Sequence, residues 1–357
     1  MSDTIILIHP INRPEDIHGT SFLRNVTFDE LGQIVRQKGG SNWIPTPITH
    51  AKMKITVEFC NANGKALFVR IFGAAPKLTV GHNVFLQNSV KAAFRVVKTL
   101  YLDHLRKCGV PAATIERISN SLTIDAVELS WHLPRSSRRA VDAILARLIK
   151  HLDILDIDYL PVGKRGDATL YLDIREGQIR IYRKLPQLRA SKRVAGSKAA
   201  IEALGGLVDK GLRVELILNS AFLKANGLDT ASAWTADIYP KMYAILLKRL
   251  GLERPPLTKR VSPGRLGRTK TMQDKLKAYF AGTFDKQSYN ATAISRFRML
   301  AKKELGLDID VEWAVHRTLP VRLADSFAYH RRFQDFAKLP HSYFSAKAAT
   351  VALAQLK

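Results

Sequence analysis

The sequence contains little cysteine and no long run of apolar residues. Cys60 and Cys108 are its two cysteines, which allow at most one disulfide bond and do not form the Cys-x-x-Cys pattern of a metal site. No segment approaches the roughly 18 consecutive apolar residues that a membrane-spanning helix needs. The N-terminal segment lacks the basic lead and the small-residue cleavage site of a signal peptide. We therefore expect a cytoplasmic protein with reduced, buried thiols and no membrane partner.

Acidic residues are scarce relative to basic ones. The 357 residues include 56 lysines and arginines but only 31 aspartates and glutamates, for a formal net charge of +25. Hydrophobic residues make up 46% of the chain, which is enough to build folded cores. So large a positive charge on a folded chain indicates a polyanionic partner. Nucleic acid is the first candidate, and an anionic membrane surface is the second.

Hydrophobic periodicity predicts an α+β fold, with an antiparallel sheet and flanking helices, followed by a mostly helical module. Residues 10–44 carry no period that we can assign. Strands are predicted where apolar and polar residues alternate, at 5–9, 53–60, 67–71, 122–129, 167–184 (a hairpin) and 212–218. Helices are predicted at 89–108, 137–150, 272–281, 291–305 and 323–336. The expected units are residues 1–228, a helical segment with a basic linker at 229–270, and a helical C-terminal domain at 271–357.

The hairpin at 167–184 carries the first candidate for catalysis. Period two places Arg180, Tyr182 and Lys184 together on the face opposite Ile179 and Ile181. A phenol beside two cations ionises more easily, and the same cations can hold a phosphate. This pattern suits a tyrosine that attacks a phosphodiester. An ordinary half-buried strand tyrosine with solvated basic neighbours is the alternative.

Four short motifs, in order, resemble the replication initiators of filamentous phages, the gene II protein and its gene X relatives. The motifs are VGHNVF at 80–85, TIDA at 123–126, IRIYRK at 179–184 and LRVELILNSAFLKANGL at 212–228. The segment ISRFRMLAKKELG at 294–306 is a looser match to the C-terminal region of that family. Each motif is short and none is specific alone, but four of them in this order form a specific combination.

The resemblance implies an enzyme that nicks one strand at a double-stranded phage origin. A tyrosine would stay on the 5′-phosphate while the free 3′-OH primes rolling-circle synthesis, and the displaced single strand would later be rejoined. Mg²⁺, with Mn²⁺ as the alternative, would be the cofactor. The setting would be the cytoplasm of a bacterial host cell. A host polymerase and a host helicase would be partners, the latter because no Walker A glycine loop is present.

By this resemblance Tyr182 is the linking tyrosine, and Lys184, two residues on, lowers its pKa or binds the scissile phosphate. Asp125 matches the acid of the family's strand motif, and Arg213 and Glu215 match its Arg-x-Glu strand. We expect Asp125 and Glu215 to share the metal ion, although acids beside arginines are often plain ion pairs. Glu128 lies three residues from Asp125, hence on the other face of a regular strand, so both cannot bind one ion without a bulge. The expected DNA contacts are Arg180, Arg183, Arg213, Lys259, Arg260, Arg265 and Arg268.

Other assignments stay open at this point. Tyr171, on the polar face of the first hairpin strand, is the nearest rival nucleophile, but no lysine follows it at the same spacing. More distant endonucleases of this kind use paired histidines, whereas this sequence has no His-x-His. His82 and His132 are weaker candidates. A non-catalytic DNA-binding replication regulator is the alternative function, and an RNA-binding protein is a third, although no aromatic RNA-binding motif supports it.

Overall fold

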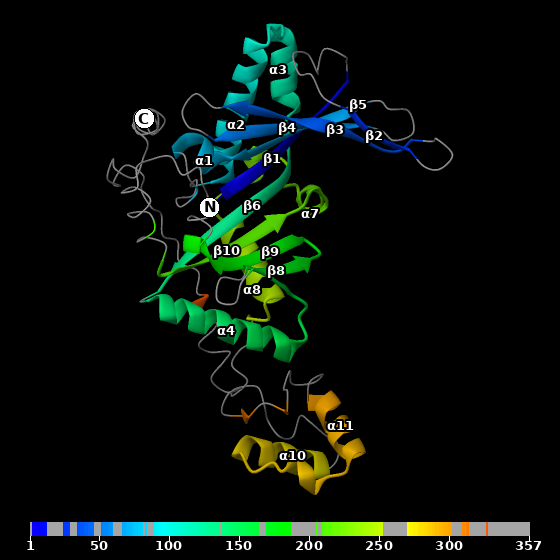
Figure 1. Cartoon of the computed structure of the whole chain (residues 1–357), viewed down its shortest axis with the longest axis vertical. Helices are drawn as coiled ribbons and strands as arrows, with labels where there is room; N and C mark the ends of the chain where they lie inside the picture. The colour runs from blue at the N-terminus through cyan, green and yellow to red at the C-terminus, as the bar shows by residue number, and fades with distance from the viewer. Residues whose placement is uncertain are drawn as a thin grey trace.

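A ten-stranded sheet organises the chain in the computed structural model (Figure 1). The strand order is β2-β3-β4-β5-β1-β6-β10-β9-β8-β7, and each neighbouring pair is antiparallel. The first strand in sequence therefore lies in the middle of the sheet, where it joins the β2–β5 half to the half that begins with β6. The chain is α+β with a large antiparallel sheet, as the periodicity predicted.

The bounds of the elements follow. The strands are β1 Ser2–Pro10, β2 Arg24–Phe28, β3 Ile34–Pro45, β4 Lys52–Phe59, β5 Ala66–Ala74, β6 Thr123–Pro134, β7 Leu160–Val162, β8 Thr169–Ile174, β9 Gly177–Arg183 and β10 Gly211–Leu218. The helices are α1 Ala75–Val80, α2 Val90–Lys107, α3 Ala112–Ser121, α4 Arg138–Leu155, α7 Ser220–Ala225, α8 Ile238–Arg249, α10 Lys270–Ala281 and α11 Ala291–Leu300, with 3₁₀ turns at Ala231–Ala233 and Lys286–Ser288.

The structure describes only part of the chain. The described residues are 2–12, 24–28, 34–45, 51–59, 66–80, 83, 89–135, 137–163, 169–186, 205, 209–252, 270–301, 309–310, 312–313 and 326–327. Within these ranges, no helix combines the length and the apolar character that crossing a lipid bilayer would require.

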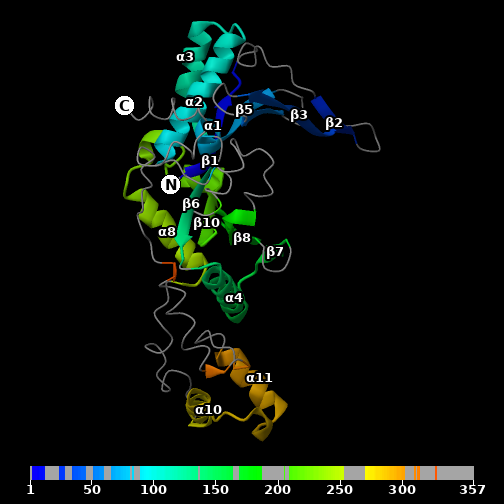
Figure 2. The ribbon, with the colours of Figure 1, turned by 60° about the vertical axis from the view of Figure 1, so that its left-hand side comes forward.

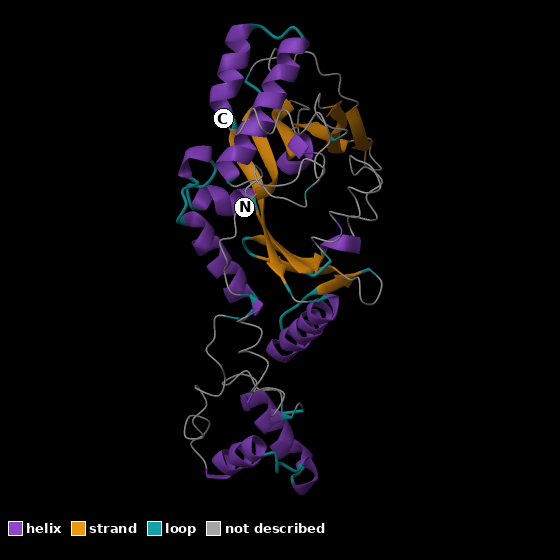
Figure 3. Cartoon of the chain, turned by 90° about the vertical axis from the view of Figure 1, so that its left-hand side faces the viewer, coloured by secondary structure: helices purple, strands orange, loops and turns teal. Residues whose placement is uncertain are grey.

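One face of the sheet forms the hydrophobic core. Alternation places Ile5 and Leu7 of β1 in this core, together with Val127 and Leu129 of β6, and all four side chains are buried. Helices α2, α3, α4 and α8 contribute buried residues to the same core. Figure 2 shows α2, α3 and α8 along one side of the strands, and Figure 3 shows the same layering by colour. The opposite face carries most of the charged side chains of the middle strands, among them Glu128, Arg180, Arg213 and Glu215.

Two helices begin where the sequence predicts. The hydroxyl of Ser89 caps α2 by accepting a hydrogen bond from the backbone N–H of Ala92 at 3.0 Å. Ser137 caps α4 in the same way through Ala140, at 3.2 Å. Because buried residues recur at helical spacing along both helices, each helix packs one apolar stripe against the core.

The hairpin of β8 and β9 also forms as predicted, with register pairs from Leu170 with Ile181 to Ile174 with Gly177. Gly177 has φ +146°, and a Cβ atom there would lie 2.0 Å from the carbonyl oxygen of Ile217. Only glycine fits this close approach of the turn to β10.

The structure differs from the sequence prediction in several places. Residues 24–28 and 34–45, which we did not assign, form β2 and β3, and residues 112–121 form the unpredicted helix α3. The strand predicted at 122–129 extends to Pro134. The segment expected as separate from residue 229 onward packs with the first core, because Tyr239, Met242, Tyr243 and Leu246 of α8 are buried in it.

Helices α10 and α11 have a hydrophobic cluster of their own. Its buried members include Leu276, Tyr279, Ile294 and Phe297. Both helices were predicted, the second with a later end, but residues 302–308 lie outside the described residues. So do the linker residues 253–269 and most of the helix predicted at 323–336.

Candidate active site

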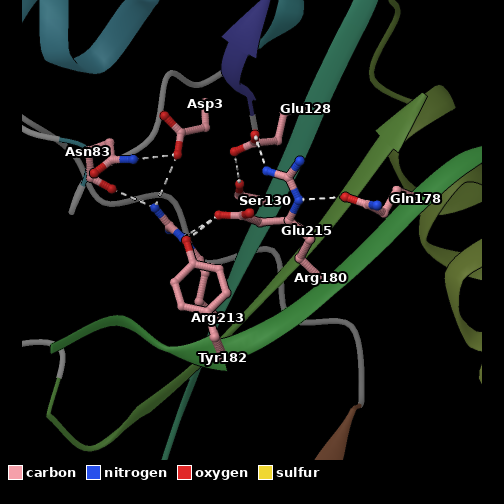
Figure 4. Close-up of polar contacts among 9 residues, drawn as sticks. All are labelled: Asp3, Asn83, Glu128, Ser130, Gln178, Arg180, Tyr182, Arg213 and Glu215. Atoms are coloured by element: carbon pink, nitrogen blue, oxygen red, sulfur yellow. Dashed lines mark hydrogen bonds and ion pairs between the residues drawn. The ribbon is translucent and has the colours of Figure 1, made fainter. Parts of the chain in front are cut away.

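The candidate site lies on the polar face of the middle strands, across from the core. In the sheet register Arg213 of β10 stands opposite Tyr182 of β9, and Glu215 stands opposite Arg180. On the other side of β10 the same two residues face His132 and Ser130 of β6. Alternation on three adjacent strands therefore brings these polar side chains to one place, as Figure 4 shows for the central members.

Tyr182 is held by Glu215. Its hydroxyl donates a hydrogen bond to Oε1 of Glu215, and only 4% of the residue is exposed. Burial raises the pKa of the phenol above its usual value; the nearby Arg213 lowers it, but the charge and hydrogen bond of Glu215 raise it further. The expectation that neighbouring cations lower this pKa is therefore wrong, because water is excluded from the phenol and a carboxylate is its closest partner.

Arg213 is the largest fully buried side chain of the described residues, with no exposed surface. Its guanidinium lies 3.6 Å from Oδ2 of Asp3 and 3.7 Å from Oε1 of Glu215, and it donates to the carbonyl of Asn83. Within the described part of the chain, its Nε and Nη1 atoms have no hydrogen-bond partner. This arginine therefore places a fixed positive charge beside Tyr182 and the carboxylates.

Three carboxylates converge beside Arg213. Asp3, Glu128 and Glu215 each offer an oxygen within 4.8 Å of the other two (Figure 4). Burial raises the pKa of Glu128 well above its usual value, and the charges of Asp3 and Glu215 raise it further. The Asn83 amide donates to Asp3 at 2.8 Å, while Oδ1 of Asp3 is buried with no hydrogen-bond partner among the described residues.

This donor set fits a hard divalent cation. Mg²⁺ and Mn²⁺ prefer carboxylate oxygens, and three buried carboxylates repel one another unless protons or a cation neutralise them. Asp3, Glu128 and Glu215 are the residues that would hold such an ion.

Asp125 takes a different partner from the one expected. Its carboxylate accepts a hydrogen bond from Nε of Arg70 at 2.8 Å, and Arg70 also contacts Glu58 at 3.2 Å. Glu215 is grouped with Asp3 and Glu128 instead. The ion pair that the sequence left open as an alternative for Asp125 is present.

Asp125 and Glu128 share a face of the sheet because strand β6 is not regular between them, which is the exception that the sequence argument allowed. The pairing of β1 with β6 shifts register between Ile6 and Leu7, so that Ala126 and Ile124 have partners and Asp125 is skipped. A bulge of this kind reverses the alternation. It brings Asp125 to the polar face while Ile124 and Val127 both stay buried in the core.

Lys184 follows β9 in a short helical turn at 184–186. Its ammonium lies 5.7 Å from the centre of the Tyr182 ring, and 1% of the residue is exposed. Burial, and then the charge of Arg213, lower the pKa of Lys184 to about 7. This lysine can therefore exchange a proton near neutral pH beside the phenol.

The other predicted DNA contacts divide into three groups. Arg180 is partly exposed, and its Nη1 atom lies 3.8 Å from Oε2 of Glu128. Its guanidinium carbon lies 5.6 Å from the centre of the Tyr171 ring. Arg183 is buried against α4, where it pairs with Asp142 at 3.1 Å. The remaining four, Lys259, Arg260, Arg265 and Arg268, lie outside the described residues, as does His82.

A pocket of about 240 Å³ reaches the site from the β8 side. It is lined by Tyr182 and Glu215 together with Thr169, Tyr171, Arg180, Arg183 and Pro186. Both candidate tyrosines therefore border one pocket, but only Tyr182 contacts Glu215.

Sequence reasoning missed Asp3 and Asn83 and did not include Glu128 among the expected metal ligands. The signal for Asp3 was weak: it is a single acid at the start of an apolar strand, and its place depends on β1 entering the middle of the sheet.

No protein-family model matches the chain, and the curated proteins include none with significant sequence similarity.

Proposed function

We propose that this protein is a site-specific DNA endonuclease and strand transferase that initiates rolling-circle replication of a filamentous phage genome. Tyr182 would be the nucleophile and would form a 5′-phosphotyrosine intermediate. The sheet with its polar catalytic face would be that of a rolling-circle endonuclease. The observation that carries the proposal is the contact of the buried Tyr182 phenol with Glu215, inside a group of three carboxylates and one buried arginine.

The chemistry needs a nucleophile, a proton acceptor and compensation for the charge on the phosphate. Oη of Tyr182 would form a bond to the phosphorus while the bond from phosphorus to the 3′ oxygen breaks. The phenol proton would pass to Oε1 of Glu215, which already accepts it in a hydrogen bond. A cation on the carboxylates would supply Lewis-acid stabilisation of the phosphate charge.

The raised pKa values fit this division of roles. A phenol that resists ionisation must lose its proton as it attacks, and this requires a positioned base. Burial raises the pKa of Glu215, although Arg213 lowers it, so that this carboxylate is a stronger base than an exposed one. Arg213, buried beside Tyr182, would offset the negative charge that develops as the phenol attacks, and Lys184, with a pKa of about 7, would protonate the leaving 3′ oxygen.

The test is nicking of supercoiled DNA that carries the cognate origin, with Mg²⁺, followed by detection of a covalent protein–DNA adduct. We expect Tyr182→Phe to lose both by about 10³-fold or more while it still binds the origin. Tyr171→Phe is the matched control, since it removes a hydroxyl from the same pocket without touching Glu215.

Two results would contradict the proposal. Nicking that survives in Tyr182→Phe and is lost in Tyr171→Phe would transfer the nucleophile to Tyr171. Tight origin binding without nicking by the wild-type chain would instead favour a non-catalytic replication regulator.

A further inference from the structure

A second group of side chains lies on the polar face, on strands β3, β4 and β5. The register places Trp43 opposite Lys54, and Lys54 opposite Phe72. Phe68 and Arg70 lie on the same side of β5 as Phe72, because Val69 and Ile71 between them are buried in the core. We name these five residues the outer platform.

The outer platform combines aromatic rings with cations. The ammonium of Lys54 lies 6.0 Å from the centre of the Trp43 ring and 5.2 Å from that of Phe72. The guanidinium of Arg70 lies 5.4 Å from the ring centre of Phe68. Trp43 is 57% exposed, an unusual position for a tryptophan that stabilises only the fold.

The outer platform and the candidate active site share one face of one sheet. Phe72 pairs across β1 with Ile6, and Ile6 pairs with Ala126 of β6. Ala126 is two residues from Glu128, hence on the same side of that strand. Arg70 also reaches over β1 to Asp125. A strand of DNA that leaves the pocket beside Tyr182 can therefore continue along this face onto the outer platform.

We propose that the outer platform binds single-stranded DNA by stacking bases on Trp43 and Phe72. The inference rests on the proposed function, which identifies the bound DNA as the single strand next to the nick. Bases stack on aromatic side chains whatever their sequence, and cations between the rings hold the phosphates. Trp43 and Phe72 are two strands apart, about 10 Å, so each ring takes its own base and Lys54 lies between them.

Charge supports a polyanion as the occupant. Among the described side chains of β4 and β5, three are basic and one is acidic: Lys52, Lys54 and Arg70 against Glu58. A duplex keeps its bases stacked inside the helix and cannot offer them to the rings, so the platform selects single strands.

The experiment measures the dissociation constant for a labelled single-stranded 20-mer by fluorescence anisotropy, in the Tyr182→Phe background so that no cleavage interferes. The variants are Trp43→Ala, Trp43→Phe and Phe72→Leu. Leu160→Ala is the matched control, because Leu160 is a comparably exposed apolar residue, 63% exposed, on the edge strand β7 at the other end of the sheet.

We expect Trp43→Ala to weaken single-strand binding by about 5- to 100-fold, with a smaller loss for Phe72→Leu. Trp43→Phe should restore most of the affinity because it keeps a stacking ring. Leu160→Ala should bind as tightly as the background, and duplex affinity should be unchanged in every variant.

Single-strand binding that is unaffected by Trp43→Ala and Phe72→Leu would overturn the inference, as would an equal loss for duplex DNA. Tighter binding of an RNA strand of the same sequence would overturn it in favour of RNA. The readout is independent of nicking. If the wild-type chain does not nick but these variants lose single-strand affinity, the proposed function fails and the binding surface remains.

Discussion

The two halves of the polar face use the same residue types in opposite ways. In the middle of the sheet, Arg213 has no exposed surface and meets Asp3 and Glu215 out of contact with water. In the outer half, the side chain of Arg70 is 32% exposed and pairs with Asp125 and Glu58 beside aromatic rings. The charges are buried in the middle of the sheet and reach solvent in the outer half.

The difference lies in the cost of removing charges from water. A buried ion pair gives little net stability, because desolvation offsets the attraction, yet its members cannot be removed singly without leaving an unpaired charge. A partly exposed pair can exchange its partners for water or phosphate at small cost. Fixed charges suit the stabilisation of a reacting phosphate, while exchangeable ones suit binding that must also release.

The largest effect expected is on folding stability. Arg213→Met should lower the free energy of unfolding by about 3–5 kcal/mol, because it leaves Asp3 and Glu215 buried without their cation. Urea denaturation measures this, with Arg70→Met as the matched control, for which we expect a loss of about 1 kcal/mol. Equal losses in the two variants would remove the distinction between the halves.

A divalent cation should stabilise the middle of the sheet and not the outer half. At 100 times its dissociation constant, Mg²⁺ should add about 2.7 kcal/mol to the free energy of unfolding of the wild-type chain. Thermal melting with Mg²⁺ or EDTA measures the gain. We expect Asp3→Asn to lose the stabilisation by Mg²⁺ and Asp125→Asn to keep it. The reverse pattern would indicate that Asp125, and not Asp3, binds the metal ion.

Protonation of Glu128 should give the middle of the sheet a pH dependence. Its folded-state pKa is raised, so the folded chain holds the proton longer than the unfolded chain does. The stabilisation is complete below the unfolded pKa of about 4.3 and is lost as the pH rises through the folded pKa.

Glu128→Gln should therefore flatten this slope and, without Mg²⁺, raise stability near pH 8 by on the order of 1 kcal/mol. Denaturation midpoints between pH 4 and pH 8 measure the change. A variant that is less stable than wild type at pH 8 would show that the Glu128 charge is favourable in the folded state.

The smallest effect on stability is expected in the outer half. Trp43→Ala should change the free energy of unfolding by no more than about 0.5 kcal/mol, because the ring is mostly exposed. Urea denaturation of the DNA-free protein measures it. A loss of several kcal/mol would indicate that Trp43 stabilises the sheet. The outer half would then be a structural region, as the middle is.

The alternation of apolar and polar residues predicted the faces of single strands and the starts of helices. Alternation at 212–218 and 179–184 placed Arg213, Glu215 and Tyr182 on the correct faces, since two neighbouring strands in register bring such residues together. The helices predicted at 89–108 and 137–150 begin where α2 and α4 do for the same reason. The middle of the candidate site was therefore predictable in outline.

The rest depended on long-range pairing and burial. Asp3 joins the site because β1 pairs with both β5 and β6, and no local signal specifies that position. The bulge at Asp125 broke the period on which the choice of metal ligands depended. The direction of the Tyr182 pKa shift depends on how much water reaches the phenol, and a sequence of charges does not show this.

The central place of β1 also has a consequence for synthesis. This strand leaves the ribosome before both of its partners, which begin at Ala66 and Thr123. At 5–20 residues per second, β1 waits roughly 6–23 s before its second edge can pair. Its apolar run from Ile5 to Ile8 is exposed during that interval, and such unpaired strands favour aggregation. The yield of folded protein should therefore depend on translation speed and on chaperones that cover a nascent strand.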